Sequence, residues 1–322
     1  MKAVVATGYG PPENFTIAEV PVPRPGPGQI QVRIAAASLN PGDVQFPSGN
    51  YQQLAPATFP HVPGNDFAGA VSEVGPGVTA YEVGDEIFGQ AVPRALRALA
   101  GAARPSLSTG SLAEYAVFEA DTPLLARRPA GLTVEHAAAL PTAGLTALGL
   151  LALADVRPGS AVLVVGASGG VGTAVVPLLA AAGARVIATA TAADEQLLRG
   201  LGAATTIGYA ESGYPAGVDV ALNLVLPGDR LGGVARALRP GGRLITIVVP
   251  APQPGQAGRD DVDVRFLLDL EGTYGGMREV GERAVRGGLP ATIGRRYPLA
   301  EGAQACTDFV RLHTTGKVVV TM

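Results

Sequence analysis

The stretch Val162-Leu163-Val164-Val165-Gly166-Ala167-Ser168-Gly169-Gly170-Val171-Gly172 decides the fold. Its first four residues belong to an apolar run, Ala161 to Val165, that is predicted to be a buried strand, and the uncharged segment Thr173 to Ala182 that follows the glycines is typical of a helix. A strand, a tight glycine turn and a helix in direct succession form the first unit of a parallel α/β sheet.

Further apolar strands are predicted downstream, and helical segments rich in Ala, Leu and Arg separate them. These strands cover Val186 to Thr189, Val218 to Leu224 and Leu244 to Val249. Such alternation predicts a doubly wound parallel sheet with right-handed crossovers, over residues 123–256.

The remainder of the chain has a different texture. Short β-like runs such as Lys2 to Ala6 and Gln29 to Ala36 alternate with turns, and the tail ends in an apolar strand, Lys317 to Thr321. We therefore expect a second, split β-rich domain of residues 1–122 and 257–322, with a ligand cleft between the two domains. Ala91 to Ser108 reads either as a helix over a cleft or as a surface insertion.

Composition excludes several classes of protein. Charged residues are 16% of 322, and 24 Lys and Arg against 27 Asp and Glu leave a net charge of -3, which gives no footprint for nucleic acid. The uncharged segment between Arg157 and Arg185 could span a bilayer by length, but its glycines would leave backbone groups unpaired there. One cysteine, Cys306, and a start without a signal-peptide layout lead us to expect a cytoplasmic protein.

The glycine turn is suited to a dinucleotide. Gly169 allows a pyrophosphate to approach the backbone, Gly172 allows the helix to pack on the strand, and the helix amides favour an anion. Ser168, Gly169, Gly170 and Val171 are the predicted contacts, although Ala167 replaces the first glycine of GxGxxG. Glycine turns also close βα units that bind nothing.

The end of the next strand bears on the choice of coenzyme. It reads Ala188-Thr189-Ala190-Thr191-Ala192-Ala193, without the carboxylate that would bind the ribose of NAD and repel a 2′-phosphate. NADPH is therefore the expected cofactor, with Thr189 and Thr191 as contacts unless they are ordinary strand residues. Asp194 and Glu195 stand where a phosphate-binding lysine would be welcome.

Along nearly its whole length the sequence resembles the medium-chain dehydrogenase/reductases, in their zinc-free quinone oxidoreductase branch. The landmarks are Ser38 to Asp43, Pro60 to Gly69, Val83 to Gly89, Gly110 to Tyr115, Ala138 to Ala147, Gly166 to Gly172 and Thr315 to Lys317. The resemblance implies a GroES-like catalytic domain beside a Rossmann domain, NADPH as cofactor, and a homodimer formed through the edge of the nucleotide sheet.

Zinc-dependent relatives place a Cys where this chain has Asn40 and a His-Glu pair where it has Asn65-Asp66. A neutral amide is a poor zinc ligand, and His61, His136 and His313 show no ligand spacing. We therefore expect no metal. Without a Lewis acid, acceptors that already stabilise incoming electrons, such as quinones and conjugated enones, are favoured.

The resemblance also nominates catalytic residues. The turn that carries Asn40 and Asp43 faces the nicotinamide in the family, and Tyr51 reaches the substrate, where its phenol could donate a proton. Gln45 and Phe46-Pro47 depart from the common pattern at this point. Loop capping is the alternative role for Asn40 and Asp43.

The family pattern further places Thr142 and Thr146 beside the nicotinamide, unless they only pack a helix N-terminus. Tyr209 would flank the 2′-phosphate without its usual lysine, for which Arg199, Arg311 or His313 could substitute. Six residues should line the cleft beyond the strand ends, unless they are plain core: Asn223, Leu224, Ile247, Val248, Phe266 and Leu267.

The sequence therefore predicts a zinc-independent NADPH:quinone oxidoreductase, whose partner is a small molecule, a quinone or activated alkene. Two alternatives stay open: an NADPH-dependent enone or enoyl reductase of a biosynthetic pathway, and a catalytically idle NADPH-binding protein.

Overall fold

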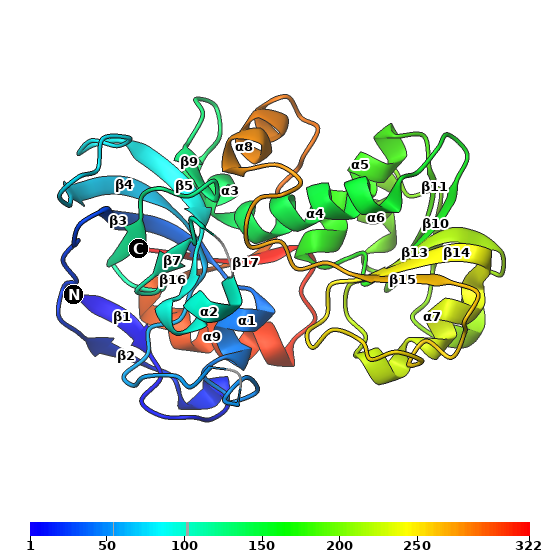
Figure 1. Cartoon of the computed structure of the whole chain (residues 1–322), viewed down its shortest axis with the longest axis horizontal. Helices are drawn as coiled ribbons and strands as arrows, with labels where there is room; N and C mark the ends of the chain where they lie inside the picture. The colour runs from blue at the N-terminus through cyan, green and yellow to red at the C-terminus, as the bar shows by residue number, and fades with distance from the viewer. Residues whose placement is uncertain (54, 101–102) are drawn as a thin grey trace. The chain divides into compact units, whose positions relative to one another are not determined.

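The computed structural model of the chain describes residues 1–53, 55–100 and 103–322. It divides into two compact units. The first comprises Met1–Leu145, Leu270–Arg286 and Ala291–Met322, and the second Thr146–Asp269 and Gly287–Pro290. Their folds confirm the predicted class, an α/β parallel-sheet domain plus a split β-rich domain (Figure 1).

The second unit contains a parallel sheet with the strand order β12-β11-β10-β13-β14-β15. Its strands are β10 (Ala161–Val165), β11 (Arg185–Thr189), β12 (Thr205–Ile207), β13 (Val218–Asn223), β14 (Leu238–Thr246) and β15 (Asp263–Phe266). Its helices are α5 (Gly170–Ala181), α6 (Glu195–Gly200) and α7 (Gly232–Ala237), and α4 (Pro141–Ala154) enters it from the first unit.

The order of the strands reverses beside β10, as in a doubly wound sheet. The chain moves from β10 through α5 and α6 to β12, then crosses back to β13 and continues through α7 to β14. In Figure 1, α5 and α6 lie on one face of this sheet and α7 on the other. The central strand is fully apolar and buried because helices cover both faces.

The strand predictions hold best in the buried centre of this sheet. β10 coincides with its predicted range, whereas β14 ends at Thr246, before the predicted Val249. β15 was not predicted, because Asp263–Phe266 is a partly exposed edge strand with two charged residues in four. Its pairing with β14 groups residues up to Asp269 with the second unit.

The first unit is built on a mixed sheet of order β6-β7-β8-β3-β4-β5-β9, with β17 paired to β3 and to β16, and on the separate pair β1-β2. Its strands are β1 (Lys2–Val5), β2 (Thr16–Glu19), β3 (Gln29–Ser38), β4 (Asp66–Val74), β5 (Glu86–Gln90), β6 (Val92–Pro93), β7 (Leu107–Ser108), β8 (Tyr115–Glu119), β9 (Leu125–Arg127), β16 (Ile293–Pro298) and β17 (Lys317–Thr321). Its helices are α1 (Pro41–Gln45), α2 (Arg97–Ala100), α3 (Val134–Ala139), α8 (Met277–Val285) and α9 (Gly302–Arg311).

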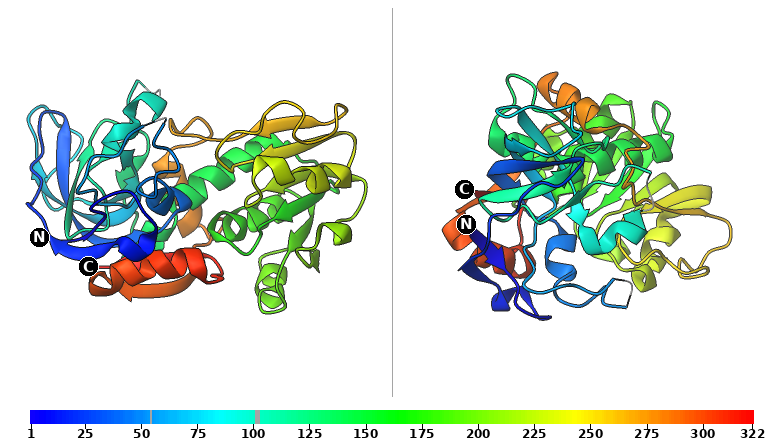
Figure 2. Two further views of the ribbon diagram at one scale, coloured as in Figure 1. Left: turned by 90° about the horizontal axis from the view of Figure 1, so that it is seen from below. Right: turned by 60° about the vertical axis from the view of Figure 1, so that its left-hand side comes forward.

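Residues 123–145 belong to this first unit because β9 pairs with β5 and α3 contacts β3 and β4. The two ends of the chain also meet here. In both views of Figure 2, α9 lies against the N-terminal segment, where Arg311 pairs with Glu13 at 2.7 Å. Phe67 and Phe118 stack at 3.9 Å in the buried core of the sheet.

The segment Ala91 to Ser108 is anchored in the sheet at both ends, because β6 and β7 pair in parallel. Between them the structure gives only short helical turns, Arg94–Leu96 and Arg97–Ala100. Residues 101 and 102, in the middle of this predicted lid or insertion, lie outside the described residues.

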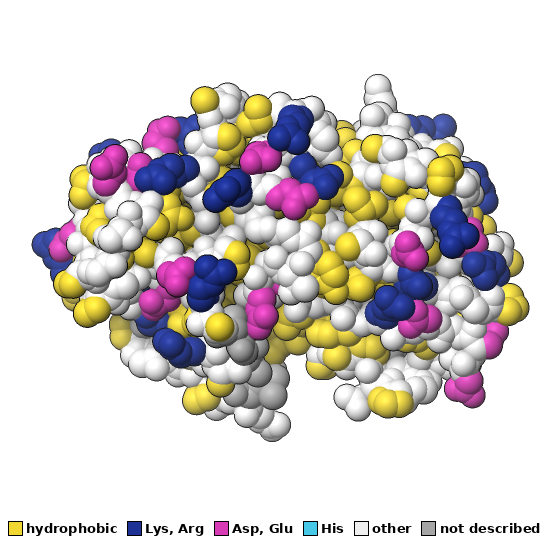
Figure 3. Space-filling model, turned by 45° about the horizontal axis from the view of Figure 1, so that its top comes forward, with side chains coloured by type: hydrophobic (Ala, Val, Ile, Leu, Met, Phe, Trp, Pro, Cys, Tyr) yellow, Lys and Arg dark blue, Asp and Glu magenta, His cyan; other side chains and the backbone are white. Residues whose placement is uncertain are grey.

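Over the described parts of the chain, no helix combines the length and the apolar character that a membrane crossing requires. On the face drawn in Figure 3, basic and acidic side chains are interspersed rather than gathered by sign. Ion pairs such as Arg127 with Asp85, at 2.6 Å, also bring opposite charges together on the protein.

Candidate active site

Three strand ends of the first unit bring polar residues together. Ser38 ends β3 and is paired with Asp66, the first residue of β4, and β17 runs antiparallel on the other side of β3. The first residue of β17, Lys317, therefore lies at the same edge of the sheet. With Asn40 and Thr142 these residues form what we call the Lys317 cluster.

Asp66 is the centre of the Lys317 cluster. Its side chain is fully buried, and the Lys317 ammonium lies 3.2 Å from Oδ2. Ser38 Oγ donates to Oδ2 at 3.2 Å, and Thr142 donates to the carboxylate through Oγ1 at 2.6 Å and through its backbone amide at 3.2 Å. Thr142 is the second residue of α4, so the carboxylate also stabilises the positive end of that helix.

The same ammonium fixes Asn40. Lys317 Nζ donates to Asn40 Oδ1 at 2.6 Å, and both residues are buried, at 5% and 7% exposure. Asn40 Nδ2 has no hydrogen-bond partner. Among the buried side-chain nitrogen and oxygen atoms of the described residues, the same is true only of Thr314 Oγ1. An unpaired buried donor is costly and rare in folded proteins, and a catalytic or ligand-binding role is one explanation for it.

Asp43 sits one turn away and is also buried. Its Oδ2 accepts from the backbone amide of Asn40 at 2.7 Å. The Asn65 amide, oriented with Nδ2 toward Asp43, donates to Oδ1 at 3.2 Å. Burial, reinforced by the nearby carboxylate of Asp66, raises the pKa of Asp43 to about 7. The capping role considered for this residue is thus present in the structure.

Tyr51 and Gln45 form a pair on the same segment. The Tyr51 hydroxyl donates to Gln45 Oε1 at 2.5 Å, and burial raises the pKa of the phenol above its usual value of 10.0. Phe46 packs edge-on against His61, whose pKa is lowered to about 4 by burial. His61 is therefore neutral near pH 7.

The glycine turn of the second unit is tight. Gly166 has φ +90, and a Cβ placed on Gly172 would lie 2.3 Å from the carbonyl oxygen of Ala167. Because α5 begins at Gly170, the first amides of this helix have no intrahelical partner and are available to an anion. This arrangement fits a pyrophosphate.

Ser168 ties the turn to the residue predicted beside the 2′-phosphate. Its hydroxyl lies 2.9 Å from that of Tyr209, which follows β12 and is 40% exposed. Arg199 reaches the same strand, because its guanidinium donates to Thr206 Oγ1 at 3.0 Å. The other two candidates, Arg311 and His313, belong to the first unit.

Thr189 and Thr191 have internal partners. Thr189 is buried, and its hydroxyl accepts from the Gly166 amide at 2.9 Å, so this residue holds the turn from inside. Thr191 donates to Asp194 at 2.7 Å, and Asp194 is only 2% exposed. Of the two acidic residues that stand at this place, Asp194 is therefore not on the surface, whereas the Glu195 side chain is 47% exposed and pairs with Arg199 at 3.6 Å.

The remaining predicted contacts of this unit lie along one edge of its sheet, where β10, β13, β14 and β15 end in register. Asn223 is buried and donates to Thr246 Oγ1 and to the Leu226 carbonyl oxygen, both at 2.8 Å, so its amide shapes the loop that follows β13. Near this edge Leu224, Ile247, Val248 and Phe266 are half-buried and Leu267 is buried. The other predicted contacts lie on helices: Gly170 and Val171 are the first residues of α5, and Thr146 lies within α4.

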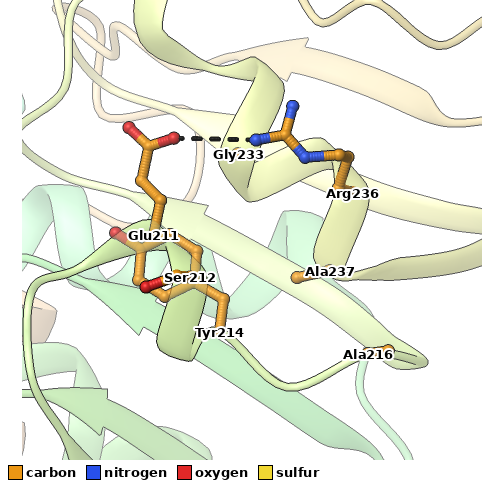
Figure 4. A pocket seen from close by; sticks show the side chains of 7 residues that line it. All are labelled: Glu211, Ser212, Tyr214, Ala216, Gly233, Arg236 and Ala237. Carbon is orange, nitrogen blue, oxygen red and sulfur yellow. Dashed lines mark ion pairs between the residues drawn. The ribbon is translucent and has the colours of Figure 1, made fainter.

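A cavity of about 350 Å³ in the second unit was not anticipated by any motif. It is lined by Glu211, Ser212, Tyr214, Ala216, Gly233, Arg236 and Ala237. Figure 4 shows the Glu211 carboxylate turned toward Arg236, 3.8 Å away. No predicted site residue lines this cavity.

Lys317 and Asp66 are the site residues that we missed. Both lay in sequence landmarks, but nothing in their spacing indicates that residues 251 positions apart form a buried ion pair. The signal available was that a charged residue opens each of two strands and is followed directly by a run of apolar residues.

Two family models match the chain: an alcohol dehydrogenase GroES-like domain over residues 26–128 and a zinc-binding dehydrogenase domain over residues 201–320. A 2-methylene-furan-3-one reductase of Solanum lycopersicum is 33% identical over 99% of this chain and 79% of its own. An NADPH-dependent alkenal/one oxidoreductase of Arabidopsis thaliana is 28% identical over the same shares. A mycocerosic acid synthase-like polyketide synthase of Mycobacterium tuberculosis is 34% identical, but the chain spans 14% of its length.

Solved structures show the same fold across the whole chain. A quinone oxidoreductase from Coxiella burnetii has a TM-score of 0.86 at 27% identity and covers 100% of this chain and 99% of its own. An NAD-dependent alcohol dehydrogenase has a TM-score of 0.83 at 30% identity and full coverage of both chains. A mycobacterial protein in complex with NADPH has a TM-score of 0.82 at 28% identity, again with full coverage of both.

The resemblance seen in the sequence is confirmed. The chain contains the parallel sheet and the GroES-like sheet, and its sequence and fold match the family models, the curated reductases and the solved structures named above. It therefore belongs to the medium-chain dehydrogenase/reductases, an oxidoreductase family with quinone oxidoreductase-like members.

Proposed function

We propose that the chain is an NADPH-dependent oxidoreductase that reduces a quinone without a metal. The observation that carries this proposal is the Lys317 ammonium, bound to Asn40 Oδ1 at 2.6 Å and to Asp66 Oδ2 at 3.2 Å. A cation of the protein itself already binds the side-chain oxygens at two of the three positions, Asn40 and Asp66, that correspond to the metal site of zinc-dependent relatives.

The side chains present do not fit zinc. Two of the three positions, Asn40 and Asn65, carry amides, which are poor zinc ligands. The third carries the carboxylate of Asp66, which is already paired with the Lys317 ammonium, and this positive charge would repel a zinc ion. Nowhere in residues 1–53, 55–100 and 103–322 do three His, Cys, Asp or Glu side chains gather in a way that could hold a metal.

The second unit supports a nicotinamide dinucleotide. The tight turn at Gly166 to Gly172 and the open amides of α5 suit its pyrophosphate. The choice of NADPH is supported by the burial of Asp194 and by the pairing of the neighbouring Glu195, whose side chain is 47% exposed, with Arg199 at 3.6 Å. It is also supported by a relative and a solved structure that are named for NADPH.

When bound, the cofactor supplies a hydride from nicotinamide C4. The protein must then provide position and one proton for the reduced acceptor. The raised pKa of Tyr51 keeps its phenol protonated at neutral pH, so this group can deliver the proton to an acceptor oxygen and be refilled from solvent. One hydride and one proton, the proton from Tyr51, convert a quinone to a hydroquinone.

Reduction of a conjugated enone is the second candidate. It is favoured by two curated relatives, an alkenal/one oxidoreductase and a 2-methylene-furan-3-one reductase. Its chemistry needs the same residues, because hydride adds to the β-carbon and the enolate oxygen or α-carbon then takes the proton. A catalytically idle NADPH-binding protein is the third.

The test is NADPH oxidation, followed at 340 nm with 1,4-benzoquinone, 9,10-phenanthrenequinone and a 2-enone. We expect turnover with at least one quinone. Turnover with the enone alone would select the second candidate, and tight NADPH binding without turnover would select the idle protein.

We also propose a homodimer formed through β15, the edge strand of the parallel sheet. Val264 and Leu268, on or just beyond this strand, are 37% and 55% exposed. Light scattering should give twice the chain mass of 32.5 kDa. A monomer at micromolar concentration would contradict this arrangement.

A further inference from the structure

We propose that Lys317 is a positioning residue that holds the Asn40 side chain with its Nδ2 donor directed to a carbonyl oxygen of a bound ligand. This inference deepens the proposed function and rests on it, because quinones, enones and the nicotinamide carboxamide all carry such an oxygen. Neither residue would transfer hydride; together they would hold and polarise the group that accepts electrons.

The ammonium decides which way the amide faces. A lysine ammonium has only donors, so the Asn40 atom 2.6 Å from Nζ must be the acceptor Oδ1. In the reversed orientation two donors would meet in a buried place. Nδ2 is therefore fixed on the far side of the amide from Lys317.

The backbone is held as firmly as the side chain. The Asn40 amide donates to Asp43 Oδ2 at 2.7 Å, and the neighbouring Leu39 amide donates to the Val318 carbonyl oxygen at 3.0 Å. The second of these bonds joins the residue after β3 to β17, the strand that carries Lys317. Asn40 is thus attached to β17 at two adjacent points.

The donor itself is left without a partner. Nδ2 is buried and makes no hydrogen bond, although Asn40 is over nine-tenths buried. Leaving a buried donor unpaired costs about 1–3 kcal/mol, and this cost is recovered if a ligand oxygen accepts the bond. A donor fixed in advance also needs no reorganisation when charge develops on that oxygen.

A lysine is distinctive at this position. Among the 24 basic residues of the chain only Lys2 and Lys317 are lysines, and all the others are arginines. A compact ammonium can contact Asn40 and Asp66 within one buried space, whereas a guanidinium needs room for a planar fork. The side chains of Lys317 and Asp66 are 6% and 0% exposed, so a larger guanidinium would have to be accommodated inside the packed protein.

The test is a double-mutant cycle with Lys317→Met and Asn40→Leu, read as kcat, as KM for the acceptor and as NADPH affinity from nicotinamide fluorescence. If Lys317 acts through Asn40, each single variant loses about 100-fold in kcat or in NADPH affinity, and the double variant loses no more than Asn40→Leu alone. Lys2→Met, the other lysine and an exposed one, is the matched control and should behave as wild type.

Folding is controlled separately, because Lys317→Met leaves Asp66 as an uncompensated buried charge. The pair Lys317→Met with Asp66→Asn removes both charges, and its unfolding temperature shows whether the cluster still folds. It should remain as impaired in function as Lys317→Met. Recovery of wild-type kcat or affinity in this folded pair would overturn the positioning role.

The quantity that falls in these variants identifies the carbonyl oxygen that accepts the Asn40 hydrogen bond. A loss confined to NADPH affinity assigns the nicotinamide carboxamide, and a loss in kcat or acceptor KM assigns the carbonyl of the substrate. Losses that multiply in the double variant, or no loss in Asn40→Leu, overturn the inference. If wild type turns over no acceptor, the proposed function fails, and the inference is then read from the Asn40 side-chain amide signals of ¹⁵N-labelled protein. These signals should shift when NADPH or benzoquinone is added to wild type but not to Lys317→Met, and signals that move equally in both would overturn it.

Discussion

The phenol of Tyr51 donates a hydrogen bond of 2.5 Å to Gln45 Oε1, six residues earlier in the chain. The residue that departs from the family pattern thus contacts the residue nominated as proton donor. Because an amide oxygen accepts but cannot take the proton away, Gln45 orients the phenol and leaves it protonated.

Replacing Tyr51 by Phe should lower kcat by about 100-fold with little change in NADPH affinity, since it removes a proton donor and not a binding group. Tyr81→Phe is the control, because the Tyr81 phenol is also partly buried with a raised pKa, yet it lies beside Arg127. Steady-state kinetics with the best acceptor measures both. Equal kcat values for wild type and Tyr51→Phe would remove Tyr51 from the mechanism.

A methyl group on Gly172 should damage the nucleotide unit. Its Cβ would lie 2.3 Å from the Ala167 carbonyl oxygen, so the turn or α5 must move. We expect Gly172→Ala to lose about 1–3 kcal/mol of stability and at least tenfold in NADPH affinity, by urea unfolding and by fluorescence titration. Gly200→Ala is the control, because no atom lies within 4 Å of its added methyl. Unchanged NADPH affinity in Gly172→Ala would contradict the assignment of this turn.

Asp43 predicts how stability depends on pH. Its pKa is about 7 in the fold against an ordinary value of 3.8, so between these values the folded state binds the extra proton. The stability contributed by this group is therefore complete below about pH 4 and is lost as the pH rises through 7. Urea unfolding from pH 4 to 8 should show this decline in wild type and a flatter profile in Asp43→Asn.

Asp85→Asn is the control for that series, since Asp85 pairs with Arg127 at the surface and its pKa is lowered. A lowered pKa makes stability rise with pH instead of fall, so removing the Asp85 carboxylate should leave the decline in stability between pH 4 and 7 in place. A decline that persists in Asp43→Asn would show that another group causes it.

Arg199 should carry part of the preference for NADPH. It is the candidate cation that shares the second unit with the glycine turn, and its side chain is 59% exposed beside β12. Arg199→Ala should weaken NADPH about tenfold and leave NADH unchanged, because only NADPH has the 2′-phosphate. Arg185→Ala, at the opposite end of the sheet strands, is the control. Tighter binding of NADH than of NADPH by wild type would refute the preference itself.

The parts of the fold that could be predicted are those with strong local patterns. The buried strand Ala161–Val165 and the strand Lys317–Thr321 were predicted to the residue, because unbroken apolar runs next to turns have few other structures. β15 has no such run, and only its pairing with β14 makes it a strand. Edge strands depend on their neighbours more than on their own residues.

The candidate site was predictable in type but not in its contacts. Asn40, Asp43 and Thr142 were identified by resemblance, yet Lys317, which binds Asn40, and Asp66, which binds Thr142, are brought there by the pairing of distant strands. Thr189 and Asn223, expected to touch the cofactor, have hydroxyl and amide groups engaged inside the protein. A polar residue at a strand end serves a turn or a ligand equally well, and only its hydrogen bonds distinguish the two.

The most direct test of the central claim measures zinc and activity on the same sample. Protein dialysed against a chelator is assayed for zinc content and for NADPH oxidation with the best acceptor from the panel. A chain that relies on Lys317 instead of a metal should keep its full rate with far less than one zinc per chain. Loss of the rate on chelation, with recovery on adding Zn²⁺, would contradict the account.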